Sequence, residues 1–176
     1  ERKKRSATER ISSHQFKQGD ATLPRISILH TGGTIASKVD YATGGTLPQY
    51  DADDMLELFP ELCELAHITS RLVRAMWSED MRFSHYNLMA AEIEKELAAG
   101  ANGVIVTHGT DTMHYTGAAL GFALEGLAKP VLIVGSQRSS DRASSDAALN
   151  LIAAVLFITK RPDFAEVALC MHETQD

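Results

Sequence analysis

The stretch Ile26–Ser37, ISILHTGGTIAS, decides the fold class of this chain. Its apolar beginning is bounded by Pro24 on one side and by Gly32 and Gly33 on the other, which is typical of a buried strand that enters a tight turn. Glycine relieves the steric limits on the backbone and lets another group approach it closely. Thr34 follows at once, so we expect its hydroxyl at the carboxyl end of the strand, where open α/β sheets bind their ligands.

Further apolar strands and helical segments alternate after this stretch. Alternation at this spacing implies a parallel sheet with helices on both faces, and continuously apolar strands fit burial on both sides. The sequence therefore predicts an α/β fold with an open, mostly parallel sheet. The expected strands are 68–76, 104–106, 131–134 and 167–171, and the expected helices are 53–58, 84–99, 113–125 and 145–158, the last buried on both sides.

Two segments carry no clear periodicity. Residues 38–50 are polar and rich in glycine, which predicts a long loop of the kind that often forms a lid. Residues 1–23 are predicted to be a charged linker or arm, and residues 24–176 to be the α/β domain. Because the chain begins with Glu1 and stops at Asp176 just after a strand, we expect it to be a piece of a longer protein.

The composition narrows the class of protein. The 176 residues are 44% apolar and only 6% aromatic, enough for one domain with a core of aliphatic side chains. A net charge of −6 argues against a surface that coats nucleic acid. No apolar run approaches the length of a membrane span, and no secretory signal is visible. Cys63 and Cys170 match no metal or redox spacing, so we expect core thiols in a reducing cytoplasm.

The candidate chemical groups all follow predicted strands. In a parallel sheet these strand ends open on one edge, so groups distant in sequence converge there. Hydroxyls and carboxylates in such a cluster suit nucleophilic acyl transfer, and we expect backbone N–H groups around Gly32 and Gly33 or around Gly109 to stabilise the oxyanion. The candidates are Thr34 after the first strand, Ser78 and Glu79 after the second, Thr110 and Asp111 after the third, and residues 136–140 after the fourth.

Simpler interpretations stay open for the same residues. Thr110 and Asp111 are also favoured as helix caps. His30, His108 and His114 would suggest a metal-dependent hydrolase, but they lie on separate elements and lack the H-E-x-x-H spacing, so we expect no metal.

Two motifs make a more specific case. Residues 31–36, TGGTIA, and residues 107–112, THGTDT, resemble the two signature motifs of the bacterial-type asparaginase family, in the expected order and at the right separation. The resemblance covers residues 24–176. Residues 135–146 look less like the free amino-acid hydrolases than like the asparaginase-like, D-type subunit of archaeal glutamyl-tRNA(Gln) amidotransferase.

The resemblance implies a role for each matching residue. Thr34 matches the nucleophile that forms an acyl-enzyme, and Tyr41 matches a mobile tyrosine that helps to activate it. Thr110 and Asp111 match the second catalytic pair, in which the aspartate also binds the substrate's amino group. A threonine hydroxyl is a poor nucleophile unless a neighbour takes its proton, so these roles are chemically consistent.

The remaining matches concern substrate binding. Ser78 and Glu79 match the pair that holds the α-carboxylate and α-amino groups, with Gly33 and Gly109 beside them. The family also uses a lysine downstream of the last strand and a smaller C-terminal domain that completes a neighbouring subunit's site. Neither lies in these 176 residues, so we expect this piece alone to be weakly active or inactive.

The resemblance also implies partners. The D-type subunit releases ammonia from glutamine, and the E-type subunit of the same amidotransferase uses it to amidate glutamate mischarged on tRNA(Gln). We therefore expect a cytoplasmic homodimer that binds the E-type subunit, reaches tRNA(Gln) through the complex, and has no membrane contact. We expect no cofactor in this subunit, with ATP and Mg only in the partner. A free cytoplasmic L-asparaginase and a non-catalytic ligand-binding module on the same fold remain the alternatives.

Overall fold

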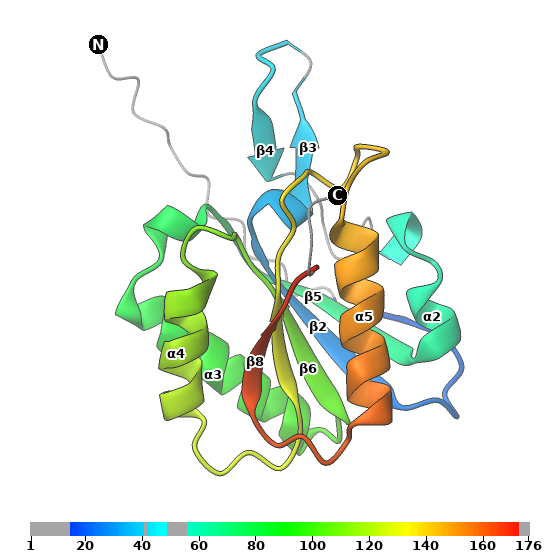
Figure 1. Cartoon of the computed structure of the whole chain (residues 1–176). Coiled ribbons are helices and arrows are strands. Elements are labelled where there is room, and N and C mark those ends of the chain that lie inside the picture. The colour runs from blue at the N-terminus through cyan, green and yellow to red at the C-terminus, as the bar shows by residue number, and fades with distance from the viewer. Residues whose placement is uncertain (1–14, 41, 49–55, 173–176) are drawn as a thin grey trace.

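A computed structural model describes residues 15–40, 42–48 and 56–172 of the chain. Within these residues six strands form one sheet, in the order β1-β5-β2-β6-β7-β8 (Figure 1). Its strands are β1 (Gln15–Gln18), β2 (Arg25–Gly32), β5 (His67–Met76), β6 (Gly103–Thr107), β7 (Val131–Val134) and β8 (Val167–Cys170). All run parallel except β1, which pairs antiparallel with β5, so the predicted open and mostly parallel sheet is confirmed.

Helices cover both faces of the sheet, as predicted (Figure 1). Successive strand residues point to opposite faces, and the two cores follow that alternation. Ile26 and Ile28 pack in the core beneath α2 and α5, whereas Leu29 packs in the core beneath α3 and α4. The helices are α2 (Leu62–Leu65), α3 (Phe83–Ala98), α4 (Met113–Ala123) and α5 (Ala147–Lys160).

The predicted loop at 38–50 is instead a short hairpin in its described part. Strands β3 (Ser37–Val39) and β4 (Thr46–Pro48) pair antiparallel and stand above the carboxyl edge of the main sheet (Figure 1). Hydrogen bonds in its turn hold the hairpin, and they leave no apolar pattern in the sequence. The hairpin was therefore not predicted from hydrophobic periodicity. The Asp40 carboxylate accepts the N–H of Ala42 at 3.0 Å, and the Asp40 carbonyl accepts the N–H of Gly44 at 2.7 Å.

Part of the predicted charged arm belongs to the sheet. Residues Gln15–Gln18 form β1, so the prediction of a solvated arm over 1–23 is wrong for these four residues. A strand at a sheet edge is held by main-chain hydrogen bonds and needs no apolar pattern, so composition alone did not reveal it. Residues 1–14 lie outside the described part of the chain.

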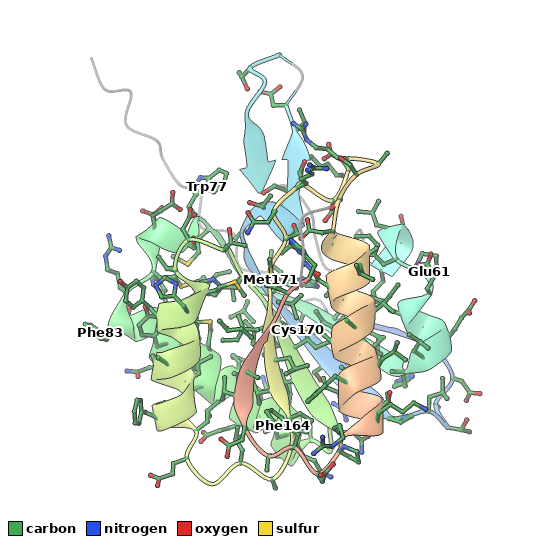
Figure 2. The ribbon with its side chains drawn as sticks, viewed as in Figure 1. Glu61, Trp77, Phe83, Phe164, Cys170 and Met171 are labelled. Atoms are coloured by element: carbon green, nitrogen blue, oxygen red, sulfur yellow. The ribbon has the colours of Figure 1, made fainter. Side chains whose placement is uncertain are left out.

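The helices differ from expectation in two respects: α2 was not predicted, and the cover of α5 is incomplete. Helix α5 is apolar almost all round, but Leu149 is 63% exposed and Leu156 is 38% exposed, so its predicted burial on both sides is wrong here. An apolar sequence shows that a helix can be buried, but it does not show which of its faces another element covers. Phe83 at the start of α3 is 85% exposed and points away from the sheet (Figure 2). Of the expected helix 53–58, residues 56–58 are described and helical.

Among the described residues, no helix has both the length and the apolarity that a membrane crossing requires.

Candidate active site

The turns that follow β2 and β6 meet backbone against backbone, and the Ser78 side chain after β5 packs against the second of these turns. A Cβ atom placed on Gly33 would lie 2.5 Å from Gly109 Cα and 2.8 Å from the His108 carbonyl carbon. A Cβ on Gly109 would lie 2.7 Å from the Ser78 Oγ. Gly33 also has φ +79° and ψ −178°, a conformation that is essentially restricted to glycine. The two motifs that carry the predicted chemistry are therefore in direct contact, and this approach requires glycine at both positions.

Side-chain hydrogen bonds hold these turns together. Thr31 Oγ1 donates to the Thr107 carbonyl at 2.7 Å and joins the ends of β2 and β6. Thr112 Oγ1 donates to the Ser78 carbonyl at 2.9 Å and joins the turn after β6 to the one after β5. The strand ends are thus fixed relative to one another before any ligand binds.

The Gly33 N–H, a predicted oxyanion donor, is engaged in a main-chain hydrogen bond. The Gly33 N–H donates to the Met76 carbonyl at 3.3 Å, so it is engaged at the end of β5. The oxyanion role of the Gly109 N–H stays a prediction.

The predicted site residues occupy this shared edge with one exception. Thr34 begins the 3₁₀ turn η1 (Thr34–Ala36) and is half-buried. Thr110 is also half-buried, and its methyl group packs against the turn that follows β7. Glu79, in the 3₁₀ turn η2 (Ser78–Asp80), and Asp111 both expose their carboxylates. Tyr41 lies outside the described residues, so its predicted role stays a prediction.

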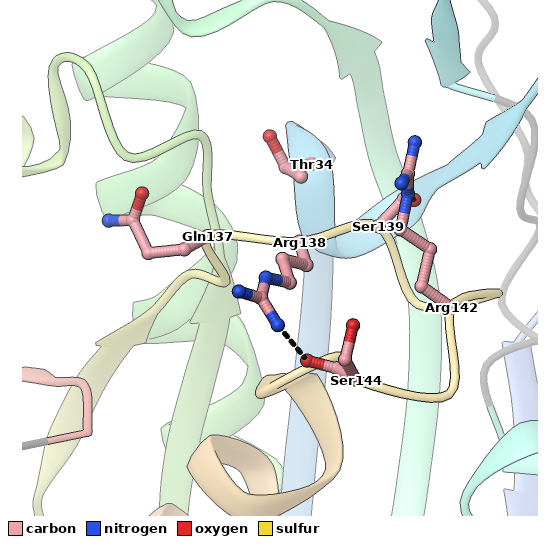
Figure 3. A pocket seen from close by; sticks show the side chains of 6 residues that line it. All are labelled: Thr34, Gln137, Arg138, Ser139, Arg142 and Ser144. Carbon is pink, nitrogen blue, oxygen red and sulfur yellow. Dashed lines mark hydrogen bonds between the residues drawn. The ribbon is translucent and has the colours of Figure 1, made fainter. Parts of the chain in front are cut away.

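A pocket of about 590 Å³ opens beside Thr34 (Figure 3). Apart from Thr34, its lining comes from the loop after β7. Arg138 and Arg142 are the charged members of that lining, although the loop as a whole also carries Asp141 and Asp146. These arginines were not among the predicted site residues, although two arginines in a serine-rich loop at the end of a parallel strand were a usable signal. The lining residues are Thr34, Gln137, Arg138, Ser139, Arg142 and Ser144.

Asp146 holds this loop in shape from the start of α5. Its carboxylate accepts the N–H groups of Gln137 at 3.0 Å and Arg138 at 3.1 Å, and the Nδ2 of Asn150 at 2.9 Å. Partial burial acts to raise the pKa of Asp146, but the two backbone N–H donors outweigh it, so the pKa lies below its ordinary value. The carboxylate therefore stays ionised and anchors the pocket wall.

The far end of the loop is tied to the segment that carries Thr34. Ser140 Oγ donates to the Ile35 carbonyl at 2.5 Å, and the Val39 N–H donates to the Asp141 carboxylate at 2.8 Å. The Val39 N–H lowers the pKa of Asp141. These contacts span more than a hundred residues of sequence and bring the β7 loop over the β2 end.

Comparison with known proteins agrees with this architecture. The family model described as asparaginase, N-terminal matches residues 25–175. The chain belongs to the asparaginase family. Among curated relatives of the family, the D-type subunit of glutamyl-tRNA(Gln) amidotransferase from Pyrococcus horikoshii is 50% identical over 167 residues, covering 94% of this chain and 38% of the relative. The corresponding subunit from Methanosarcina barkeri is 48% identical over 165 residues, with the same two coverages.

Solved asparaginase structures match the fold. L-asparaginase I from Vibrio cholerae has a TM-score of 0.75 and 31% identity over 84% of this chain and 44% of that one. A probable cytoplasmic L-asparaginase from Campylobacter jejuni has a TM-score of 0.72 and 34% identity, with the same coverages. The chain therefore spans less than half the length of these relatives.

His30 is a buried histidine of this asparaginase-family sheet. Its Nδ1 lies 3.0 Å from Thr107 Oγ1, and its Nε2 lies 2.9 Å from Ser70 Oγ. Burial lowers the pKa of His30 to about 4, so the ring is neutral at physiological pH. Its two bonds link β2 to both neighbouring strands, which is a structural role.

His108 supports the second signature turn of the family. Its Nδ1 lies 2.7 Å from the Gly109 carbonyl, and its Nε2 lies 2.8 Å from Thr116 Oγ1. Burial lowers the pKa of His108, although the bond to Gly109 opposes the shift. In the neutral ring, Nδ1–H donates to the carbonyl and Nε2 accepts from the hydroxyl. His108 therefore has a structural role, whereas the only role weighed for it from the sequence was that of a metal ligand.

The three histidines do not converge on a common point. His30 and His108 are engaged in separate hydrogen bonds, and the exposed His114 ring lies against Tyr115 with its centroid 4.1 Å away. In the part of the chain that the structure describes, no group of three or more His, Cys, Asp or Glu side chains is placed to hold a metal ion.

Proposed function

We propose that this chain is the amidohydrolase portion of a D-type glutamyl-tRNA(Gln) amidotransferase subunit and releases ammonia from the side-chain amide of glutamine. One observation carries the proposal: Gly33 and Gly109 pack against each other, so the turns that bear Thr34 and Thr110 share one point of the sheet edge. Identity of about 50% to curated D-type subunits supports this choice within the family.

The reaction proceeds through an ester of Thr34. The Thr34 hydroxyl attacks the carbonyl carbon of the side-chain amide and gives up its proton, with Tyr41 and Thr110 as the proposed activating neighbours. The carbon–nitrogen bond breaks, the nitrogen takes the proton, and ammonia leaves. Water then attacks the ester, which restores the Thr34 hydroxyl and releases the acid product as a carboxylate and a proton. The Gly109 N–H is the proposed donor to the oxyanion of each tetrahedral intermediate.

The amino-acid end of the substrate lies toward the β5 and β6 ends in this proposal. The exposed carboxylates of Glu79 and Asp111 complement an α-ammonium group, and the Ser78 hydroxyl donates to the α-carboxylate. Ser78 itself is 3% exposed and packs against Gly109, so its hydroxyl position is set by the backbone contact described above.

The partners follow from the same proposal. The E-type subunit receives the ammonia and amidates glutamate on tRNA(Gln), with ATP and Mg bound in that partner and no cofactor in this subunit. A homodimer in the cytoplasm completes the assembly. The support is the relationship to curated D-type subunits, which extend well beyond the part that this chain matches.

A free L-asparaginase is the second candidate. It is favoured by the structural likeness to L-asparaginase I, with a TM-score of 0.75. Glutamine and asparagine differ by one methylene, which a binding pocket distinguishes by only about 1–3 kcal/mol. The fold alone therefore does not separate the two substrates.

Ammonia release from glutamine and asparagine, measured on the full-length protein with its E-type partner and charged tRNA, tests the proposal. Thr34→Ala should lose activity by about 10³-fold or more, whereas Thr34→Ser keeps a hydroxyl and should retain more. Thr159→Ala is the matched control, because this threonine lies near the far end of α5 and its hydroxyl donates to the Leu156 carbonyl within that helix. Undiminished turnover by Thr34→Ala would refute the mechanism.

A covalent probe separates an enzyme from a binding module. A diazo-ketone analogue of glutamine should add its mass to Thr34, as read by mass spectrometry of peptides. Absence of an adduct in the assembled full-length protein would favour a non-catalytic module on the same fold.

A further inference from the structure

The wall of the pocket beside Thr34 is cationic. Arg138 and Arg142 are the only ionisable residues among its six lining residues, and both are exposed (Figure 3). Arg138 donates to the Ser144 carbonyl and Arg142 donates to the Ser139 hydroxyl, both at 3.3 Å. Each guanidinium has five N–H donors, so most of them stay available.

No carboxylate neutralises these two groups within ion-pair distance among the described residues. The neighbouring carboxylate of Asp141 acts on Arg142 only at longer range and accepts the Val39 N–H instead. A guanidinium that is oriented but unpaired is suited to bind a carboxylate or phosphate oxygen.

The position of the arginines fits one end of an amino-acid ligand. Along the sheet edge the order of strands is β5, β2, β6 and β7. Ser78 follows β5, Thr34 follows β2, and the arginine loop follows β7 and crosses to the Thr34 segment through Ser140. Ser78 and Glu79 of the proposed head site therefore lie across Thr34 from the arginine loop, whereas Asp111, after β6, lies on the same side of Thr34 as that loop.

The charge on that side of Thr34 changes during the proposed reaction. The substrate presents a neutral amide to Thr34, whereas the product presents a carboxylate. Hydrogen bonds from guanidinium to an ionised acceptor are markedly stronger than those to a neutral one. The same pocket therefore distinguishes acid from amide.

We propose that Arg138 and Arg142 form an anion subsite that binds the side-chain carboxylate of the acid product. The inference rests on the proposed function, because that reaction defines which ligands are substrate and product. It follows that the protein binds L-glutamate more tightly than L-glutamine, and that accumulated product inhibits turnover until it leaves.

The test compares two ligands that differ only at the reacting end. Isothermal titration with L-glutamate and L-glutamine is run on the full-length protein carrying Thr34→Ala, so that no ligand is consumed. Adding Arg142→Gln or Arg138→Gln should lower the ratio of glutamate to glutamine affinity by about tenfold. Arg161→Gln is the control, because Arg161 is exposed and pairs with Asp163 beyond the other end of α5. Urea unfolding confirms that each variant is folded.

The remaining outcomes also decide the matter. An unchanged ratio in both arginine variants, or equal weakening of both ligands, would overturn the subsite. If neither L-glutamate nor L-glutamine binds, L-aspartate and L-asparagine are compared in the same way. An arginine-dependent preference for L-aspartate would then support the subsite, and the lack of any such preference would overturn it. If wild-type protein releases no ammonia but still prefers the acid through the arginines, the proposed function fails while the subsite stands.

Discussion

Gly33→Ala should destabilise the protein by roughly 2–6 kcal/mol. The backbone contribution is about 1–3 kcal/mol, because φ +79° with ψ −178° is strained for any residue with a side chain. The packing contribution is of similar size, about 1–3 kcal/mol, because the new Cβ would lie 2.5 Å from Gly109 Cα and 2.8 Å from the His108 carbonyl carbon. Both obstacles are backbone atoms, which cannot move aside as a flexible side chain would.

Two other glycines separate these contributions. Gly44 has φ +69° and no atom within 4 Å of the position that a Cβ would take, so Gly44→Ala should cost only the backbone part, about 1–2 kcal/mol. Gly121 lies in α4 with an ordinary φ and open space around it, so Gly121→Ala should stabilise the protein by about 0.5–1 kcal/mol. The loss of unfolding free energy in Gly33→Ala, minus the loss in Gly44→Ala, therefore measures the contact between the two signature turns.

The measurement is the free energy of unfolding from urea titrations of the three variants and the wild type. Ammonia release is recorded in parallel, because a displaced Gly109 turn should also impair turnover. If Gly33→Ala and Gly44→Ala cost the same within about 0.5 kcal/mol, the turns do not touch as described and the shared site is refuted.

Two further predictions concern buried ionisable groups. Burial holds the pKa of His30 at about 4, so the contribution of its neutral ring to the free energy of unfolding is complete above pH 6.5 and falls by up to about 3 kcal/mol as the pH drops to 4. His30→Gln should therefore reduce the slope of the free energy of unfolding against pH between about 6.5 and 4. An unchanged slope would contradict this prediction. Glu96 is 4% exposed, accepts a hydrogen bond from the Ser27 hydroxyl and pairs with Arg71, so Glu96→Gln should lower the free energy of unfolding by about 2–4 kcal/mol in urea titrations. The exposed neighbour Glu94 provides the matched control, Glu94→Gln. Equal losses in the two variants would contradict a buried network.

The local pattern of the chain predicted most of the regular elements. The run 131–134 matches β7 residue for residue, and the expected helix at 84–99 differs from α3 by one residue at each end. Both have strong periodicity and clear boundaries. The hairpin of β3 and β4 was missed because hydrogen bonds around Asp40 form its turn, and such bonds leave no apolar period in the sequence.

The candidate site divides in the same way. The motifs around Thr34 and Thr110 were visible as residues that follow apolar strands, and their resemblance to the asparaginase family was specific. The positions of Arg138 and Arg142 at the end of a parallel strand were visible in the sequence, but their place beside Thr34 depends on the contact of Ser140 with Ile35.

By itself, the sequence determined the central parallel strands, the long helices and the chemical groups that stand at the strand ends. Each of those properties depends on neighbouring residues, through hydrophobic period, turn chemistry and capping. Only the tertiary structure decided that β2 lies between β5 and β6, and that the loop after β7 folds back onto the β2 end. Strand order and loop closure arise from contacts between residues far apart in the chain, and no local pattern encodes them.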